Sequence, residues 1–65
     1  MKEDFTEVEL RVLRFARDHG EVCDRNFRAS ILHGLSIDKM LEHVTYRETS
    51  GNIYKLTDDG HALLG

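Results

Sequence analysis

Residues Val44–Leu64, VTYRETSGNIYKLTDDGHALL, decide the fold, because they predict a β-hairpin that leads directly into a short helix. Apolar and polar residues alternate over positions 44–48 and again over positions 52–56, as in strands that bury one face. Thr49-Ser50-Gly51 separates the two runs. Gly51 is expected to take the left-handed conformation that completes a three-residue hairpin loop, since glycine does so at no steric cost.

The alternation also predicts how the two strands pair. With a three-residue loop, both tyrosines and both aliphatic residues of the hairpin fall on one face, as a half-buried sheet requires. We expect the tyrosine pair to be buried in the core, with stacking on exposed bases as the alternative. The expected pairs are Glu48 with Asn52, Tyr46 with Tyr54, and Val44 with Leu56.

Capping signals predict a helix at each end of the chain. Thr6 and Glu9 have the spacing of a capping box for a helix over Glu7–Asp18, and Gly20 is expected to end that helix. Thr57 is expected to cap the closing helix, which has two aspartates in its first turn, where the helix dipole favours acids.

Two further helices are expected in the middle of the chain. Asp24 is the expected N-cap of a helix over Arg25–Leu32, and His33-Gly34-Leu35 is the expected turn after it. Ser36 would then cap a helix over Ile37–His43. A helix, a turn that contains glycine and a second capped helix form the order of a helix-turn-helix motif.

The composition indicates one small globular domain over residues 1–65. Hydrophobic residues make up 40% of the chain, and no apolar run is long enough to span a membrane. The amphipathic N-terminal segment does not have the pattern of a signal peptide. A single cysteine, Cys23, excludes an internal disulfide, so we expect a reducing, cytoplasmic setting in which Cys23 is a small buried side chain.

The segment Tyr54–Leu64 resembles the end of winged helix-turn-helix domains, in which the last strand carries an aromatic-x-Leu-Thr motif and leads into a helix with glycine and paired leucines. With Glu21–Cys23 as a short edge strand, the order of elements over Thr6–Leu64 is also similar to that family. The resemblance implies an α+β, mainly α fold, with three helices, a β-hairpin wing and a short C-terminal helix. It further implies a sequence-specific transcriptional regulator that binds double-stranded DNA as a homodimer.

The resemblance also implies which residues contact DNA. In winged-helix DNA binders the third helix enters the major groove and the wing touches the backbone or the minor groove. Carried over to this chain, Ser36, Lys39 and His43 are the expected base readers, while Arg28 and the basic residues of the wing hold phosphates. The expected DNA-binding residues are Arg25, Arg28, Ser36, Lys39, His43, Arg47, Ser50, Asn52 and Lys55.

Charge supports a different class of function. The formal net charge is −3, and the expected third helix carries Asp38 and Glu42 beside Lys39. Acids repel phosphate, so cations elsewhere must offset them. The alternative hypothesis is therefore a winged-helix protein–protein interaction module, an adaptor or inhibitor that binds no nucleic acid.

Leu10 is an exception to the pattern of the first helix, because it falls on the polar side between Arg14 and Arg17. It is either a lone surface leucine or part of a dimer contact formed with these two arginines. We expect no enzyme, cofactor or metal site. The histidines and Cys23 lack the spacing of a zinc site, and a chain of 65 residues has little room for a deep catalytic pocket.

Overall fold

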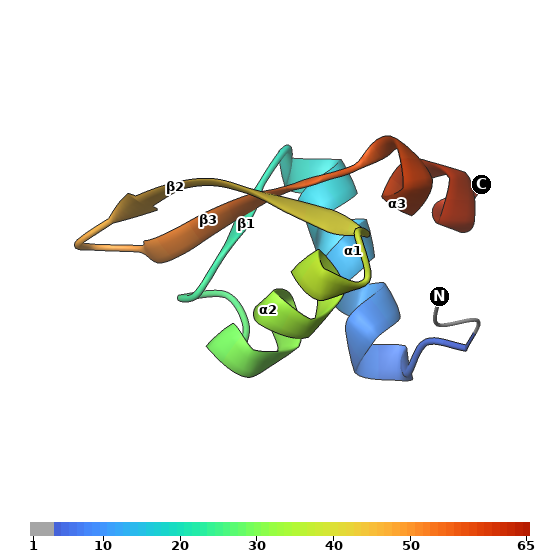
Figure 1. Cartoon of the computed structure of the whole chain (residues 1–65), viewed down its shortest axis with the longest axis horizontal. Helices are drawn as coiled ribbons and strands as arrows, with labels where there is room; N and C mark the ends of the chain where they lie inside the picture. Colours follow the sequence, from blue (N-terminus) through green and yellow to red (C-terminus); the bar gives the residue numbers. More distant parts are fainter. Residues whose placement is uncertain (1–3) are drawn as a thin grey trace.

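The computed structural model describes residues 4–65, which form three α-helices and a three-stranded antiparallel sheet (Figure 1). The protein is thus a small α+β structure. Strand β3 lies in the centre of the sheet, with β1 and β2 on its two sides. The elements in chain order are α1 (Glu7–His19), β1 (Val22–Cys23), α2 (Ala29–Ile37), β2 (Leu41–Arg47), β3 (Gly51–Leu56) and α3 (Asp58–Leu64).

Helix α1 confirms the prediction for the first helix and extends it by one residue. The Glu9 backbone N–H donates to the Thr6 hydroxyl (3.2 Å), and the Thr6 N–H donates to the Glu9 carboxylate (2.9 Å), which completes the capping box. Gly20 ends the helix at φ 85°, in the left-handed region. Each cap lies within a few residues of its partner, and therefore the sequence alone predicted it.

The middle of the chain differs from the prediction, because the described residues contain one helix there instead of two. Neither Arg25–Leu32 nor Ile37–His43 is helical over its length. Residues 24–27 form a turn in which the Asn26 N–H donates to the Cys23 carbonyl (2.9 Å). Helix α2 then runs through Gly34, since the residues around it repeat with helical spacing and glycine does not by itself end a helix.

The end of α2 explains why the expected third helix does not form. Lys39 has φ 64°, so the chain reverses there. The Met40 N–H donates to the Leu35 carbonyl (2.9 Å) and the Lys39 N–H to the Ser36 carbonyl (3.0 Å), the two bonds of a Schellman motif. Residues 41–43, which were predicted as helix, therefore belong to strand β2.

The β-hairpin is present, but its predicted register is wrong. Strand β2 begins at Leu41, three residues before the expected start, and a bulge at Val44 shifts the pairing within the strand. Tyr54 is buried as expected, whereas Tyr46 is 62% exposed. Gly51 has φ 78°, which confirms its left-handed conformation. The observed pairs include Leu41 with Leu56, His43 with Tyr54, Thr45 with Ile53, Tyr46 with Asn52, and Arg47 with Gly51.

Both longer helices contribute to one hydrophobic core against the sheet. Helix α1 contributes Val12, Leu13 and Ala16, and α2 contributes Leu32 and Leu35, all essentially buried. The strands and the corner before β2 complete the core. Their buried residues are Val22, Met40, Leu41 and Tyr54.

Helix α3 closes the fold, as predicted, and Thr57 fixes it to the corner between α2 and β2. The Thr57 hydroxyl accepts from the Gly60 N–H (3.0 Å) and donates to the Lys39 carbonyl (2.6 Å). A Cβ at Gly60 would lie 2.6 Å from the Met40 carbonyl oxygen. Only glycine fits at this close approach. Within residues 4–65, no helix has both the length and the apolar character that crossing a membrane requires.

Candidate nucleic-acid interface

Hydrogen bonds join the turn before α2 to the hairpin. The Asp24 carboxylate accepts from the backbone N–H of Asn52 (2.9 Å) and from its side-chain amide (3.2 Å). The Asn52 amide oxygen lies 2.9 Å from His43 Nε2. A Cβ at Gly51 would lie 2.7 Å from the Cβ of Asp24, so the two segments touch. Asp24 therefore holds the hairpin beside the start of α2, and it does not cap a helix.

Tyr54 is a buried side chain that lies next to this network. Its ring packs edge-on against the ring of His43, with centroids 5.5 Å apart. Burial raises the pKa of the Tyr54 hydroxyl above its usual value, and the Asp24 carboxylate raises it further. Among the residues described, Asp24 Oδ1 is buried without a hydrogen-bond partner. The Tyr54 hydroxyl thus keeps its proton, and the side chain is an uncharged part of the core.

The N-terminal end of α2 is basic. Arg28 stands at the N-cap position, Arg25 precedes it in the turn, and both are exposed. Helices α1 and α3 have two acids each in the first turn, whereas α2 has none. The positive end of the α2 dipole is therefore not neutralised by its own chain, and such an end favours a phosphate group.

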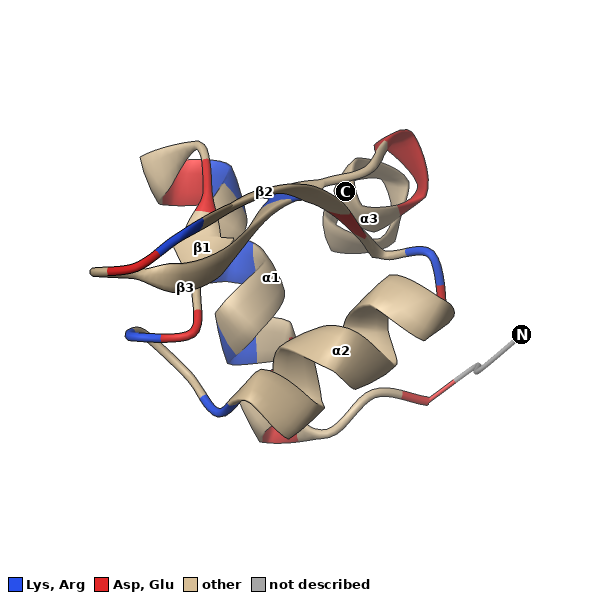
Figure 2. Ribbon diagram, turned by 60° about the vertical axis from the view of Figure 1, so that its left-hand side comes forward, with Lys and Arg blue, Asp and Glu red and all other residues tan. Residues whose placement is uncertain are grey.

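The hairpin adds Arg47 to this side of the molecule. In Figure 2 the turn that carries Arg25 and the outer part of the hairpin lie on the same side, away from α3. Helix α2 begins after this turn, and it is coloured tan throughout because it contains no charged residue. We call this region the α2–hairpin surface. It consists of Arg25, Arg28, the exposed side of α2 and the outer hairpin, which carries Arg47 and the adjacent exposed Glu48.

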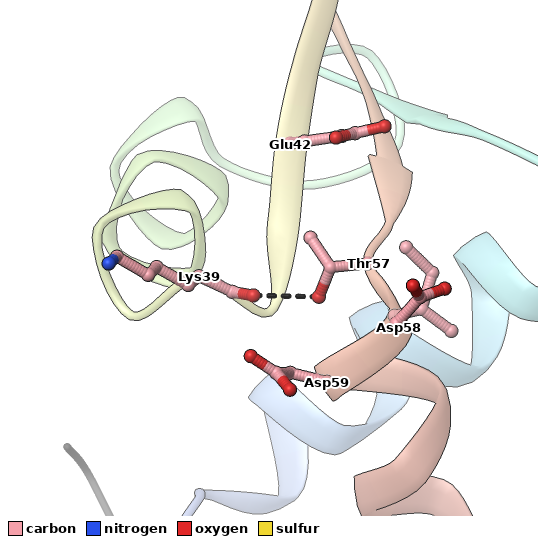
Figure 3. A pocket seen from close by; sticks show the side chains of 6 residues that line it. Lys39, Glu42, Thr57, Asp58 and Asp59 are labelled. Atoms are coloured by element: carbon pink, nitrogen blue, oxygen red, sulfur yellow. Dashed lines mark hydrogen bonds between the residues drawn. The ribbon is translucent and has the colours of Figure 1, made fainter.

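The opposite end of α2 is acidic. Lys39 lies there in an open pocket of about 460 Å³ together with Glu42, Asp58 and Asp59 (Figure 3). The expected base reader Lys39 thus lies at a corner of the fold that also carries these three acids. Acidic residues disfavour phosphate, so the two ends of α2 differ in the partner that they favour.

The expected DNA-binding residues do not form a single surface. Ser36 is half-buried in α2, Lys39 is at the acidic corner, and His43 lies on β2, so the three expected base readers do not share one helix. Lys55 pairs with Glu42 across β3 and β2, on the sheet face opposite Tyr54. Ser50 lies in the hairpin turn and Asn52 in the hydrogen-bond network with Asp24. Arg25, Arg28 and Arg47 fit the α2–hairpin surface.

The sequence interpretation missed the exposed side of α2. Ala29, Ser30, His33 and Ile37 are exposed there. The signal that could have found them is the spacing of Ile31, Leu32 and Leu35, which continues one helix across Gly34. These four residues occupy the part of the fold that the prediction gave to a turn and two helix ends.

The three residues of the expected dimer contact differ in their exposure. Leu10 is half-buried, while Arg14 and Arg17 are exposed, and Arg17 pairs with Asp18 at 3.1 Å. Val8, which the helical pattern predicts to face the core, is 43% exposed. The outer side of α1 therefore carries charged residues together with the partly exposed Val8 and Leu10.

Comparisons with known proteins give no family: no family model, curated protein or solved structure matches the chain. Within the described part of the chain, no three histidine, cysteine or acidic side chains are grouped so that they could hold a metal ion. The geometry and charge of the α2–hairpin surface are therefore the features of the molecule that bear on its function.

Proposed function

We propose that the protein is a small DNA-binding transcriptional regulator and a variant of the winged helix-turn-helix fold. In this proposal, residues 24–28 replace the second helix of the family by a turn, and α2 takes the place of the helix that enters the major groove. The hairpin β2–β3 is the wing. The order of elements and the central place of β3 support this assignment.

The single observation that carries the proposal is the unequal distribution of charge around α2. Arg25 and Arg28 flank its N-terminal end, where the helix dipole is positive, and the nearby Asp24 is held by Asn52. Many of the acids that give the chain its net charge of −3 lie elsewhere, in the first turns of α1 and α3 and at the corner after α2. A negative chain can bind a polyanion through one locally basic surface.

Titration of a 20-base-pair duplex with the protein tests the proposal. With three phosphate contacts, affinity should fall about 40-fold between 50 and 200 mM salt, because each contact contributes about 0.9 to the slope of log affinity against log salt. The variant with Arg25, Arg28 and Arg47 all changed to Ala should lose most of this slope.

Lys39→Ala is the control, since it removes one positive charge that lies outside the proposed surface. The sequence interpretation expects it to weaken binding, whereas the proposed surface expects little change, since Lys39 lies at the acidic corner. Wild-type protein that binds no duplex even at about 10 mM salt, where screening is weakest, would contradict the proposal.

A protein-interaction module is the second candidate function, and one observation favours it. Ile37 is 67% exposed at the end of α2 that lies next to the acidic corner. An exposed isoleucine beside acids suits a partner with an apolar and basic surface. This candidate requires that the protein binds no duplex at low salt and that Ile37→Ser abolishes binding to the partner.

A further inference from the structure

The exposed side of α2 is uncharged in a chain in which 32% of the residues are charged. At about 100° per residue, its four exposed residues fall within an arc of about 100°, opposite the buried Leu32 and Leu35. Ile37 is 67% exposed, the highest value among the large hydrophobic side chains that the structure describes as exposed. These four residues, which we call the α2 outer face, are Ala29, Ser30, His33 and Ile37.

Gly34 borders this face, and the fold does not explain its presence. A Cβ at Gly34 would meet no described atom within 4 Å, whereas a Cβ at Gly60 would lie 2.5 Å from Leu56 Cδ1. Glycine is unfavourable inside a helix compared with alanine, so Gly34 weakens α2 without an internal benefit. A partner that approaches the helix closely at this point would supply the reason.

The residue types of α2 limit what it can recognise in a major groove. Bidentate readout of guanine uses Arg or Lys, readout of adenine uses Asn or Gln, and readout of cytosine uses Asp or Glu. None of these types occurs between Ala29 and Ile37. Apolar contact with the 5-methyl group of thymine is the base-specific interaction that Ala29 and Ile37 can make. Ser30 and His33 can add hydrogen bonds.

We propose that the α2 outer face recognises the 5-methyl groups of thymine in the major groove, with Gly34 as the point of closest approach. This inference rests on the proposed DNA-binding function. Charge complementarity favours DNA at the N-terminal half of the uncharged face, because Arg25 and Arg28 flank it, whereas Ile37 lies at the end next to the acidic corner. The arginines hold the backbone, and the apolar residues distinguish bases by the presence of a methyl group.

Duplexes that differ only in this methyl group test the inference. Binding of alternating A·T duplex is compared with A·U duplex built from deoxyuridine, and alternating G·C duplex with one that contains 5-methylcytosine, all at about 50 mM salt. Affinity should fall about fourfold for each methyl contact that is removed, or about fifteenfold for two contacts. The 5-methylcytosine duplex should bind more tightly than unmodified G·C.

Ile37→Ser should lower the ratio of A·T to A·U affinity about fourfold, because it removes one methyl contact, while Leu63→Ser should leave the ratio unchanged. Leu63 is 40% exposed on α3, so it matches the loss of an exposed apolar side chain away from α2. The matched pair separates methyl recognition from any difference in duplex shape. Gly34→Ala should raise the urea midpoint of unfolding and yet weaken binding. Unchanged or stronger binding would overturn the role of Gly34.

The possible failures can be told apart. Equal affinity for the A·T and A·U duplexes, with salt-dependent binding intact, overturns methyl recognition and leaves the DNA-binding function standing. A ratio of A·T to A·U affinity that Ile37→Ser leaves unchanged overturns the assignment to α2. Failure to bind any duplex at low salt overturns the inference together with the proposed function, and the outer face then belongs to a protein partner.

Discussion

Helices α1 and α2 bury equivalent inner faces and present very different outer ones. Each contributes fully buried leucines to the same core, Leu13 from α1 and Leu35 from α2. Helix α1 has a capping box, acids in its first turn and a glycine at its left-handed end. Helix α2 has no side-chain cap among the described residues, no acid in its first turn and Lys39 in the left-handed conformation at its end.

The difference indicates that residues of the chain itself stabilise both ends of α1, whereas the ends of α2 lack such stabilisation. Capping, dipole compensation and glycine at the left-handed position each stabilise a helix by about 0.5–1 kcal/mol. Helix α2 lacks all three and also contains Gly34. A partner that supplies anions at its N-terminal end and fits closely against its outer face would compensate for these deficits.

The largest expected effect tests whether the two inner faces are equivalent. Leu13→Ala and Leu35→Ala should each lower the free energy of unfolding by about 3 kcal/mol, since each removes a fully buried side chain and leaves a cavity. Urea unfolding followed by circular dichroism measures both values. A loss below about 1 kcal/mol for Leu35→Ala alone would mean that α2 is loosely packed, and its outer face could not then be treated as a fixed surface.

Sequence reasoning was successful where a signal and its partner are close along the chain. Thr6 bonds with Glu9, and Thr57 bonds with Gly60, so both caps were predictable from spacing. Asp24 has the same local appearance as a cap, but its carboxylate accepts from Asn52, 28 residues away. No local pattern reveals that competition, and the predicted second helix was wrong for this reason.

In the hairpin and the candidate site, too, local sequence patterns predicted the elements but not how they are placed relative to one another. Alternation predicted two strands, and the loop predicted the left-handed Gly51, but the turn pairs Arg47 with Gly51, so that Tyr46 lies opposite Asn52 and is exposed. The bulge at Val44 shifts the pairing again farther from the turn. Arg28 and Arg47 were predicted as phosphate contacts from the resemblance to winged-helix domains, and both belong to the α2–hairpin surface. The expected base readers fell on different elements, because their assignment depended on where α2 ends.

A smaller effect is expected from exchanging the caps of the two helices. Thr6→Ala should lower the free energy of unfolding by about 1 kcal/mol. Arg28→Ser should raise it by about 0.5–1 kcal/mol, because serine supplies the missing cap of α2. The same Arg28→Ser variant should weaken duplex binding, because it removes a cation from the α2–hairpin surface. Urea unfolding and duplex titration on one preparation measure the two opposite effects.

Arg25→Ser is the control for this exchange. It removes the same charge from the turn but does not occupy the N-cap position, so it should weaken binding without a gain in stability. Equal stability gains for Arg25→Ser and Arg28→Ser would show that relief of charge repulsion, and not capping, is the cause.

The smallest expected effect concerns the residue that ends each helix. Gly20→Ala should cost about 1 kcal/mol, because a side chain is strained at positive φ, although a Cβ there would touch no described atom within 4 Å. Lys39→Gly should raise the free energy of unfolding by about 0.5 kcal/mol, because glycine adopts a positive φ without strain. Lys39→Ala keeps the Cβ and removes the charge, and exposed charge pairs contribute little, so its stability should be close to that of the wild type. A loss above about 1 kcal/mol for Lys39→Ala would mean that its charge stabilises the acidic corner formed with Glu42 and Asp59. In that case the strained end of α2 would have an internal reason, and only its N-terminal end and outer face would still require a partner.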